Sequence, residues 1–481
     1  MKRMETSNWI GGGWSKPSAG TLEARNPSDL SDAVGVVHLS GKADLLQAVE
    51  AARFAQPKWA ALTGAARGEC LYRMADLLER NAAELATLAS REMGKPIAEM
   101  RGEVTRGVNL LRYYAGEGVR ANGQIIPSAL PNVKQYSVRV PLGVVAIVTP
   151  WNFPVAIPIW KIAPALICGN SVVWKPAENA CLTAAKMIEI LSAAKLPEGT
   201  LNLVIGKGSA IGQTLLEVAP IDAVSFTGST GTGMRVASAC AARNLKFQTE
   251  MGGKNAAVVL RDADLDIAVP AIVSGAFRSA GQKCTATSRI IVDQAIYGEF
   301  AERLAAATSG LRMANALDER AYLGPVASHE QFKTVTDYVA MARADATTVA
   351  VAPEADDAAE GYYVPPLVVE GVAADHPLVQ EEVFGPLAVL LPAANTDEAI
   401  HLVNQTVFGL SASVFTRDLT NAFRFLEEAE AGMVRVNQET GGVEYQAPFG
   451  GMKGSSSHTR EQGQSALDFY SHIKTCAIQF R

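Results

Sequence analysis

The sequence predicts an α/β protein with two parallel β-sheets, each covered by helices on both faces. Short, continuous apolar segments alternate with longer segments whose apolar residues recur every three or four positions. The alternation forms two series, one before and one after Glu250. Continuous apolar strands that alternate with helices are typical of parallel sheets buried on both faces. At roughly 150 residues per domain, the 481 residues suggest two to four domains.

The first series follows a Gly-rich stretch of 40 residues, which we expect to be irregular with short strands. Residues 69–94 have helical spacing and end at Gly94, a residue type that commonly ends helices. Residues 124–143 are expected to form extended strands around a turn. The series continues with strands at 143–149, 171–175, 201–206 and 223–228, and with helices at 156–169, 181–195, 210–218 and 232–244.

The second series has strands at 255–260 and 288–292 and helices at 264–281 and 297–308. Residues 475–480 are expected to form an edge strand. Together with residues 124–141, this strand would suit pairing between subunits. The sequence therefore contains two α/β units and a smaller β extension.

Composition argues against several classes of protein. The net charge of -6 is spread along the chain without a basic run, so neither nucleic acid nor an anionic membrane is an expected partner. Residues 142–160 are long enough to span a membrane, but Pro150, Pro154 and Pro158 would leave backbone groups unpaired in lipid. The six cysteines lie far apart, which predicts neither a disulfide framework nor a metal site. Free thiols and the absence of a signal peptide favour the cytoplasm.

Two segments suit a dinucleotide. "FTGSTGTG" (226–233) lies at a strand-to-helix turn, where glycines let the backbone approach a phosphate. Its spacing differs from the usual dinucleotide fingerprint, and such turns also occur without a nucleotide. "WKPAEN" (174–179) follows a strand end and offers Lys175 and Glu178. A carboxylate there can accept hydrogen bonds from ribose hydroxyls and would repel a 2′-phosphate, but a solvated ion pair at a helix start is the alternative.

Three polar residues are candidates for catalysis. Asn152, between prolines and aromatics, can donate to an oxyanion or simply stabilise a turn. Glu250, beside two glycines, is either a general base or a strand-end residue facing water. Cys284 follows a helix and a Gly-containing turn, and Lys283 and Arg289 could lower the pKa of its thiol. Free cysteines are usually buried and inert, however, and spacing alone does not bring the three residues together.

Read together, the motifs resemble the aldehyde dehydrogenase superfamily over essentially the whole chain. "TPWNFP", "KPAE", "FTGST", "EMGGKN", "GQKC", "EEVFGP" and "PFGGMK" have that family's order and spacing. The resemblance implies that Cys284 is the nucleophile, that Asn152 and the Cys284 N–H form the oxyanion hole, and that Glu250 activates water to hydrolyse a thioester. Lys161 is implied as a further catalytic residue. Covalent catalysis of this kind divides a difficult oxidation into two easier steps.

The same resemblance implies a Rossmann-like NAD(P)-binding domain (1–123 and 142–250), a catalytic domain (251–440) and oligomerisation strands (124–141 and 465–481). NAD is favoured over NADP because of Glu178, and a homodimer or homotetramer is expected. No metal ion is expected. The implied cofactor contacts are Trp151, Lys175, Glu178, Gly208, Phe226, Gly228, Ser229, Gly233, Gly252, Glu382 and Phe384.

Closer matches, such as "RYYAGEGVRANGQIIPS" and "QAPFGGMKGSSSHTREQG", resemble bacterial 2-oxoglutarate semialdehyde (2,5-dioxopentanoate) dehydrogenases. Such a small-molecule aldehyde carries a distant carboxylate, for which a planar arginine is a suitable partner. Arg278 is the candidate, although it could instead cap the end of a helix. Succinate semialdehyde ranks lower because Trp160 stands where the enzymes for that aldehyde carry a second arginine. Ser455, Trp160 and Phe449 are the other implied substrate contacts, and the extra residue in "KGSSSHTRE" could reshape the substrate mouth around Ser456 and Ser457.

Overall fold

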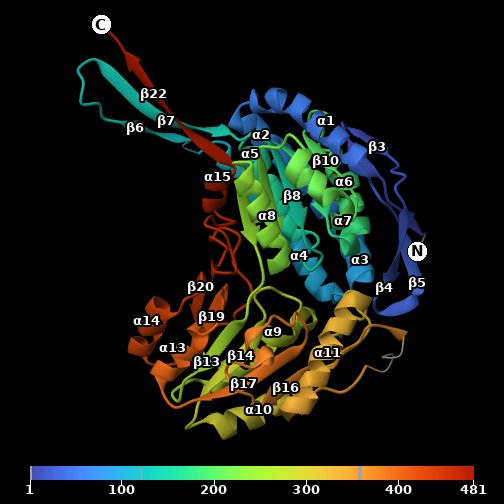
Figure 1. Ribbon diagram of the computed structural model, residues 1–481, viewed down its shortest axis with the longest axis vertical. Helices are drawn as coiled ribbons and strands as arrows, with labels where there is room; N and C mark the ends of the chain where they lie inside the picture. Colours follow the sequence, from blue (N-terminus) through green and yellow to red (C-terminus); the bar gives the residue numbers. More distant parts are fainter. Residues whose placement is uncertain (1–2, 121, 356–359) are drawn as a thin grey trace.

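The computed structural model describes residues 3–120, 122–355 and 360–481 and confirms the α/β class (Figure 1). Two seven-stranded sheets form the two halves of the molecule, and a three-stranded sheet projects from one end. The first 40 residues are more regular than predicted, because they form a further sheet of order β1-β5-β4. Its strands are β1 (Met4–Glu5), β4 (Thr21–Asn26) and β5 (Asp29–His38).

The first large sheet has the order β12-β11-β8-β9-β10-β2-β3. The strands from β12 to β10 are parallel, whereas β2 and β3 add an antiparallel edge. The bounds are β2 (Asn8–Ile10), β3 (Gly13–Ser15), β8 (Val144–Thr149), β9 (Ser171–Pro176), β10 (Leu201–Leu203), β11 (Ala223–Thr227) and β12 (Lys246–Glu250).

Helices cover both faces of this sheet, as its continuous apolar strands predict. Val145 and Ile147 pack into a core with α2 to α6, while the alternate residues Val144 and Ala146 pack with α1, α7 and α8. The bounds are α1 (Lys42–Ala60), α2 (Gly64–Arg80), α3 (Ala82–Met93), α4 (Ile97–Glu117), α5 (Ala156–Ile167), α6 (Cys181–Ser192), α7 (Gly208–Gln213) and α8 (Thr230–Ala242).

The second large sheet has the order β15-β16-β17-β14-β13-β19-β20, and only β15 is antiparallel to its neighbour. Its strands are β13 (Asn255–Val259), β14 (Thr287–Asp293), β15 (Thr347–Val351), β16 (Leu367–Glu370), β17 (Leu387–Ala393), β19 (Ser411–Phe415) and β20 (Met433–Val436). The bounds of the remaining helices are α9 (Leu265–Phe277), α10 (Tyr297–Ser309), α11 (His329–Asp345), α12 (Pro377–Gln380), α13 (Thr396–Asn404), α14 (Leu419–Glu428) and α15 (Ser465–Phe469).

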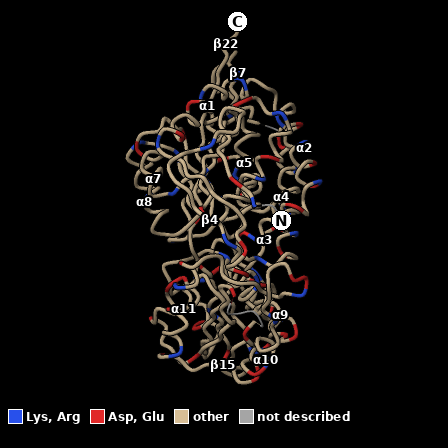
Figure 2. Tube along the Cα trace, turned by 90° about the vertical axis from the view of Figure 1, so that its right-hand side faces the viewer, with Lys and Arg blue, Asp and Glu red and all other residues tan. Residues whose placement is uncertain are grey.

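The projecting sheet has the order β22-β7-β6, with bounds β6 (Gly123–Ile126), β7 (Val133–Pro141) and β22 (Ser471–Gln479). It extends beyond the body in both views (Figures 1 and 2). The edge strand predicted from Thr475 begins earlier, at Ser471, and pairs with β7 over its whole length. Ile125, Ile473 and Ile478 are exposed on this sheet. A short pair, β18 (Phe408–Gly409) and β21 (Met452–Lys453), completes the strands assigned in the described chain.

Two predicted helices are shorter in the structure. The helix predicted at 69–94 is divided at Asn81, although Gly94 does end α3 in the left-handed conformation. The helix predicted at 264–281 ends at Phe277, and Ser279 and Ala280 then adopt φ values of 56° and 54°. The carboxylate of Glu99 accepts hydrogen bonds from the N–H and hydroxyl of Ser279, which hold this unusual turn in place.

Charged residues of both signs are interspersed along the chain in the side view (Figure 2). Within the described residues, no helix combines the length and apolar character that a membrane span requires. The segment 142–160 forms β8, a loop and the first part of α5, as the sequence predicts.

Candidate active site

The site lies where the two large sheets meet. The carboxyl ends of β8, β9, β11 and β12 share one edge of the first sheet, because these strands are parallel and in register. The chain then passes from Glu250 at the end of β12 through four residues to the start of β13. Loops before β14 and β17 carry Cys284 and Glu382 to the same region. The topology therefore brings together residues that are far apart in the sequence.

Asn152 and the segment of Cys284 are in direct contact. The side-chain Nδ2 of Asn152, which is 3% exposed, donates a hydrogen bond of 3.1 Å to the Gln282 carbonyl. An amide nitrogen has two N–H groups, so one donor is left for another acceptor. The carbonyl of Cys284 is fixed by Asn255, whose Nδ2 donates to it over 2.8 Å. Cys284 itself packs against the apolar cluster of Leu410, Met433 and Phe449.

The prediction that cationic neighbours lower the pKa of Cys284 is wrong. Burial raises the pKa of this thiol, and the carboxylates of Glu382 and Glu250 raise it further. Arg289 is occupied elsewhere: it donates to the carbonyls of Lys254, Leu402 and Val403 over 2.9, 2.5 and 3.0 Å. The thiol is therefore protonated at neutral pH, and it must lose its proton as it attacks an electrophile.

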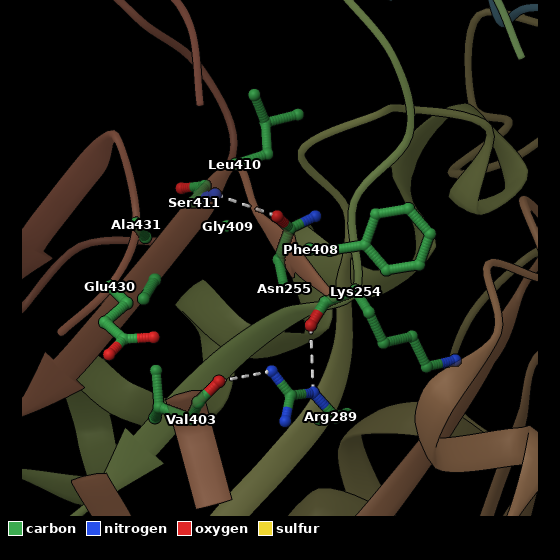
Figure 3. Close-up of a pocket in the computed structure, with 11 residues that line it drawn as sticks. Lys254, Asn255, Arg289, Val403, Phe408, Gly409, Leu410, Ser411, Glu430 and Ala431 are labelled. Atoms are coloured by element: carbon green, nitrogen blue, oxygen red, sulfur yellow. Dashed lines mark hydrogen bonds between the residues drawn. The ribbon is translucent and has the colours of Figure 1, made fainter. Parts of the chain in front are cut away.

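Figure 3 shows the structural role of Arg289 and Asn255 in a small pocket behind the site. Asn255 accepts a hydrogen bond of 3.0 Å from the Ser411 N–H, and Arg289 ties the chain before β13 to the end of α13. The ammonium of Lys254 points away from Glu430 and Val403 in this view. Burial lowers the pKa of Lys254 to about 7. Arg289 thus supports the loop that carries the site rather than the thiol.

Glu250 is 2% exposed, and its environment favours the neutral acid. Burial raises its pKa well above the ordinary value, and the nearby charge of Glu461 adds to the effect. The hydroxyl of Ser456 opposes this shift, because it donates to Glu250 Oε2 over 2.5 Å. The same hydroxyl accepts from the Gly451 N–H over 2.6 Å, which fixes its direction. A buried carboxylate with a raised pKa is suited to general base catalysis.

Ser456 and Ser457 pack against β12, so the expectation that they reshape the substrate mouth is replaced by a different role. Ser457 Oγ accepts from the Thr249 N–H over 2.9 Å, and the Met251 N–H donates to the Ser455 carbonyl over 2.8 Å. Residues 455–457 therefore hold the end of β12, and Ser456 is the member that contacts the carboxylate of Glu250.

Ser456→Ala should raise the pKa of Glu250, because the replaced hydroxyl stabilises the charged carboxylate. We expect the acid limb of the steady-state oxidation rate to move to higher pH, which a pH–rate profile measures. Ser457→Ala is the matched control, since it removes a neighbouring hydroxyl that does not touch Glu250, and Ser456→Thr should restore the profile. An unchanged acid limb in Ser456→Ala would show that Ser456 does not tune Glu250.

Lys161 is fully buried and lies in a polar network beneath Glu250. Its ammonium donates to Ser225 Oγ over 2.9 Å and forms an ion pair with Glu461. The charge of Lys161 lowers the pKa of Glu250, whereas that of Glu461 raises it. Sequence reasoning missed Glu461, although a buried lysine implies a carboxylate partner.

The predicted adenosine-side residues are close together. Lys175 Nζ lies 3.5 Å from Glu178 Oε1 and donates to the Pro176 carbonyl over 3.0 Å. Glu178 Oε1 also accepts a hydrogen bond of 2.8 Å from the Gly208 N–H, which joins two predicted contacts. The ion pair that the sequence left as an alternative is therefore present, and Glu178 is only half-buried beside it.

The N-terminus of α8 leaves space for a phosphate. Ser229 precedes the helix without capping it, and space is open beside the Cα of Gly231. Gly228 and Gly233 are tightly packed, since a Cβ at Gly228 would lie 2.6 Å from the Phe226 ring and one at Gly233 would lie 2.4 Å from Met251 Sδ. An uncapped helix start with open space and free N–H groups fits the pyrophosphate of a dinucleotide.

Glu382 and Phe384 lie between Cys284 and the first sheet. Glu382 Oε1 accepts from the Gly253 N–H over 3.0 Å, and a Cβ at Gly252 would lie 2.2 Å from the other carboxylate oxygen. Burial raises the pKa of Glu382 to about 7. Phe384 packs edge-on against Trp151 with 5.5 Å between ring centroids. These four residues form one continuous group beside Cys284.

The predicted substrate contacts divide into two groups. Trp160 and Phe449 pack together with ring centroids 5.3 Å apart, next to the Cys284 cluster. Arg278 is exposed at the end of α9 and lies over the ring of Tyr322 at 5.4 Å. Ser455 is fully buried, and its hydroxyl accepts from the Gly409 N–H over 3.0 Å, so it holds the loop. In the described residues, no group of three or more His, Cys, Asp or Glu could hold a metal ion.

Comparisons with known proteins agree with this arrangement. The model of the aldehyde dehydrogenase family matches residues 14–476. The alpha-ketoglutaric semialdehyde dehydrogenase of Bacillus subtilis is 46% identical, over 98% of each chain. The 2,5-dioxopentanoate dehydrogenase of Saccharolobus solfataricus is 39% identical, over 96% of this chain and 97% of that protein. The crystal structure of Staphylococcus aureus betaine aldehyde dehydrogenase in complex with NAD+ has a TM-score of 0.95 at 32% identity, covering 98% of this chain and 95% of the other.

Proposed function

Because the chain belongs to the aldehyde dehydrogenase family, we propose that it oxidises a semialdehyde with a distant carboxylate, 2-oxoglutarate semialdehyde, to 2-oxoglutarate. The full-length similarity to two dehydrogenases named for this substrate is the observation that carries the proposal. Succinate and glutarate semialdehydes are the alternative substrates, since they present the same two functional groups.

In the proposed mechanism, the sulfur of Cys284 attacks the aldehyde carbon and forms a thiohemiacetal. The remaining N–H of Asn152 and the backbone N–H of Cys284 stabilise the negative oxygen. A bound nicotinamide cofactor accepts a hydride and thereby leaves a thioester on Cys284. Glu250 then removes a proton from water, whose oxygen attacks the thioester carbonyl and releases the carboxylic acid. Glu461 and Lys161 set the charge around Glu250.

NAD is the proposed cofactor. Lys175, Glu178 and Gly208 would hold the adenosine ribose, and the open N-terminus of α8 with Ser229 would hold the pyrophosphate. Glu382, Gly252, Trp151 and Phe384 would hold the nicotinamide riboside. A 2′-phosphate would lie against the carboxylate of Glu178, and this repulsion disfavours NADP.

A homodimer or homotetramer in the cytoplasm is also proposed. The projecting sheet, with exposed Ile125, Ile473 and Ile478, has unpaired edges and an apolar surface that would suit pairing with another copy. Light scattering of the purified chain measures its assembly directly.

A panel of aldehydes with NAD and NADP in parallel tests the proposed function. We expect kcat/KM to be highest for 2-oxoglutarate semialdehyde with NAD, and Glu178→Gln to increase the relative use of NADP. Pentanal is the uncharged control of similar length. A preference for pentanal over every carboxylated semialdehyde would contradict the proposed substrate class.

A further inference from the structure

Three unpaired nitrogen donors lie together beside the aromatic part of the candidate site. Arg106 Nε, Trp160 Nε1 and Gln462 Nε2 are buried, and none has a hydrogen-bond partner among the described residues. Trp160 is 6% exposed and Gln462 is fully buried. Buried donors usually have partners, because an unpaired donor costs about 1–3 kcal/mol. Three in one place indicate a position for an acceptor.

Direct contacts join these residues into one group. Arg106 Nη2 donates to Gln462 Oε1 over 2.9 Å, and the guanidinium lies 6.0 Å from the centroid of the Trp160 ring. Gln462 has a φ of 59°, which is uncommon for a residue other than glycine and is often found at functional sites. The preceding residue pairs with Phe449 through backbone hydrogen bonds of 2.6 and 2.7 Å, so Gln462 is held next to that aromatic ring.

The group is at a defined position relative to the thiol. Cys284 packs against the cluster that contains Phe449, and Phe449 packs against Trp160, whose other neighbour is Arg106. Two aromatic rings therefore separate the sulfur from the guanidinium. An aldehyde bound to Cys284 with its chain along these rings would present its far end to Arg106.

The positive charge of Arg106 is not neutralised locally. Glu103, one turn earlier on α4, is already paired with Lys95 and accepts the N–H groups of Val155 and Ala156. Burial and the charge of Arg435 lower the pKa of Arg106, which nevertheless remains a guanidinium cation at neutral pH. Arg435 itself donates to the carbonyls of Glu439 and Gly441. An anion at Arg106 would therefore relieve both the unpaired donors and the uncompensated charge.

We propose that Arg106, with Trp160 and Gln462, binds the distant carboxylate of the aldehyde and so determines the preference for acidic substrates. This inference rests on the proposed function and assigns the carboxylate to α4 rather than to Arg278. Arg278 is less suited because it is exposed and already lies over Tyr322. Arg106 was not among the residues that the sequence singled out.

The test compares Arg106→Met with the wild type on 2-oxoglutarate semialdehyde and on pentanal. We expect KM for the acidic aldehyde to rise about tenfold to a hundredfold, the usual size of a lost charged hydrogen bond. The kcat value and the kinetics of pentanal should change little, and Arg106→Lys should retain part of the preference. Arg112→Met is the matched control, since Arg112 lies on the same helix in a surface ion pair with Glu79.

Inhibition by glutarate separates this proposal from the proposed substrate. Glutarate should compete with pentanal in the wild type and inhibit Arg106→Met at least tenfold more weakly. If 2-oxoglutarate semialdehyde is a poor substrate but glutarate inhibition still depends on Arg106, the carboxylate site stands and the substrate proposal fails. Equal losses for acidic and uncharged aldehydes in Arg106→Met, or a selective loss in Arg278→Met, would overturn the assignment.

Discussion

Cys284→Ala should reduce the production of NADH from every aldehyde by on the order of a thousandfold or more, because the covalent route is lost. Asn152, Glu250 and the cofactor contacts would remain, but the alanine methyl group cannot form the thiohemiacetal. Initial rates at 340 nm with saturating NAD measure the effect. The loss should appear in kcat and should be the same for acidic and uncharged aldehydes.

Cys168→Ala is the matched control for this prediction. Cys168 is also a free cysteine whose pKa is raised by burial, but it lies at the end of α5 and not at the meeting edge of the sheets. Its variant should keep full activity, and the Cys284 variant should still bind NAD. Turnover retained in Cys284→Ala would exclude the thiohemiacetal mechanism.

The sequence predicted most strands and helices because apolar periodicity is a local property that the fold preserves. The break at Asn81 and the turn at Ser279 were missed, since each depends on contacts that local spacing does not contain. Ser279, for example, is held by Glu99, 180 positions away.

The site shows the same division between local and long-range information. Residue chemistry alone left Cys284 an ordinary buried thiol, and only the ordered motifs singled it out. Arg289 was wrongly assigned because nearness in sequence suggested a contact that its hydrogen bonds to carbonyls exclude. Arg106 and Gln462 are 356 positions apart, so their contact became visible only in the fold.

Glu250→Gln should separate the two halves of the reaction. The amide cannot remove a proton from water, so thioester hydrolysis should slow by roughly a hundredfold to ten-thousandfold. Formation of the thioester does not require this base, and a burst of about one NADH per active site should therefore precede the slow steady state. Rapid mixing with an aldehyde and NAD measures both phases.

The pH dependence provides an independent test of the same role. The neutral acid of Glu250 cannot act as a base, and burial raises its pKa. The wild-type steady-state rate should therefore rise with pH through that raised pKa, whereas Glu250→Gln should lose this limb. Hydroxylamine, which attacks thioesters without needing a base, should restore much of the turnover in the variant. A variant with an unchanged burst, steady-state rate and acid limb would require the base to be another residue, and Glu461, which is buried beside Glu250, would then be the next to replace.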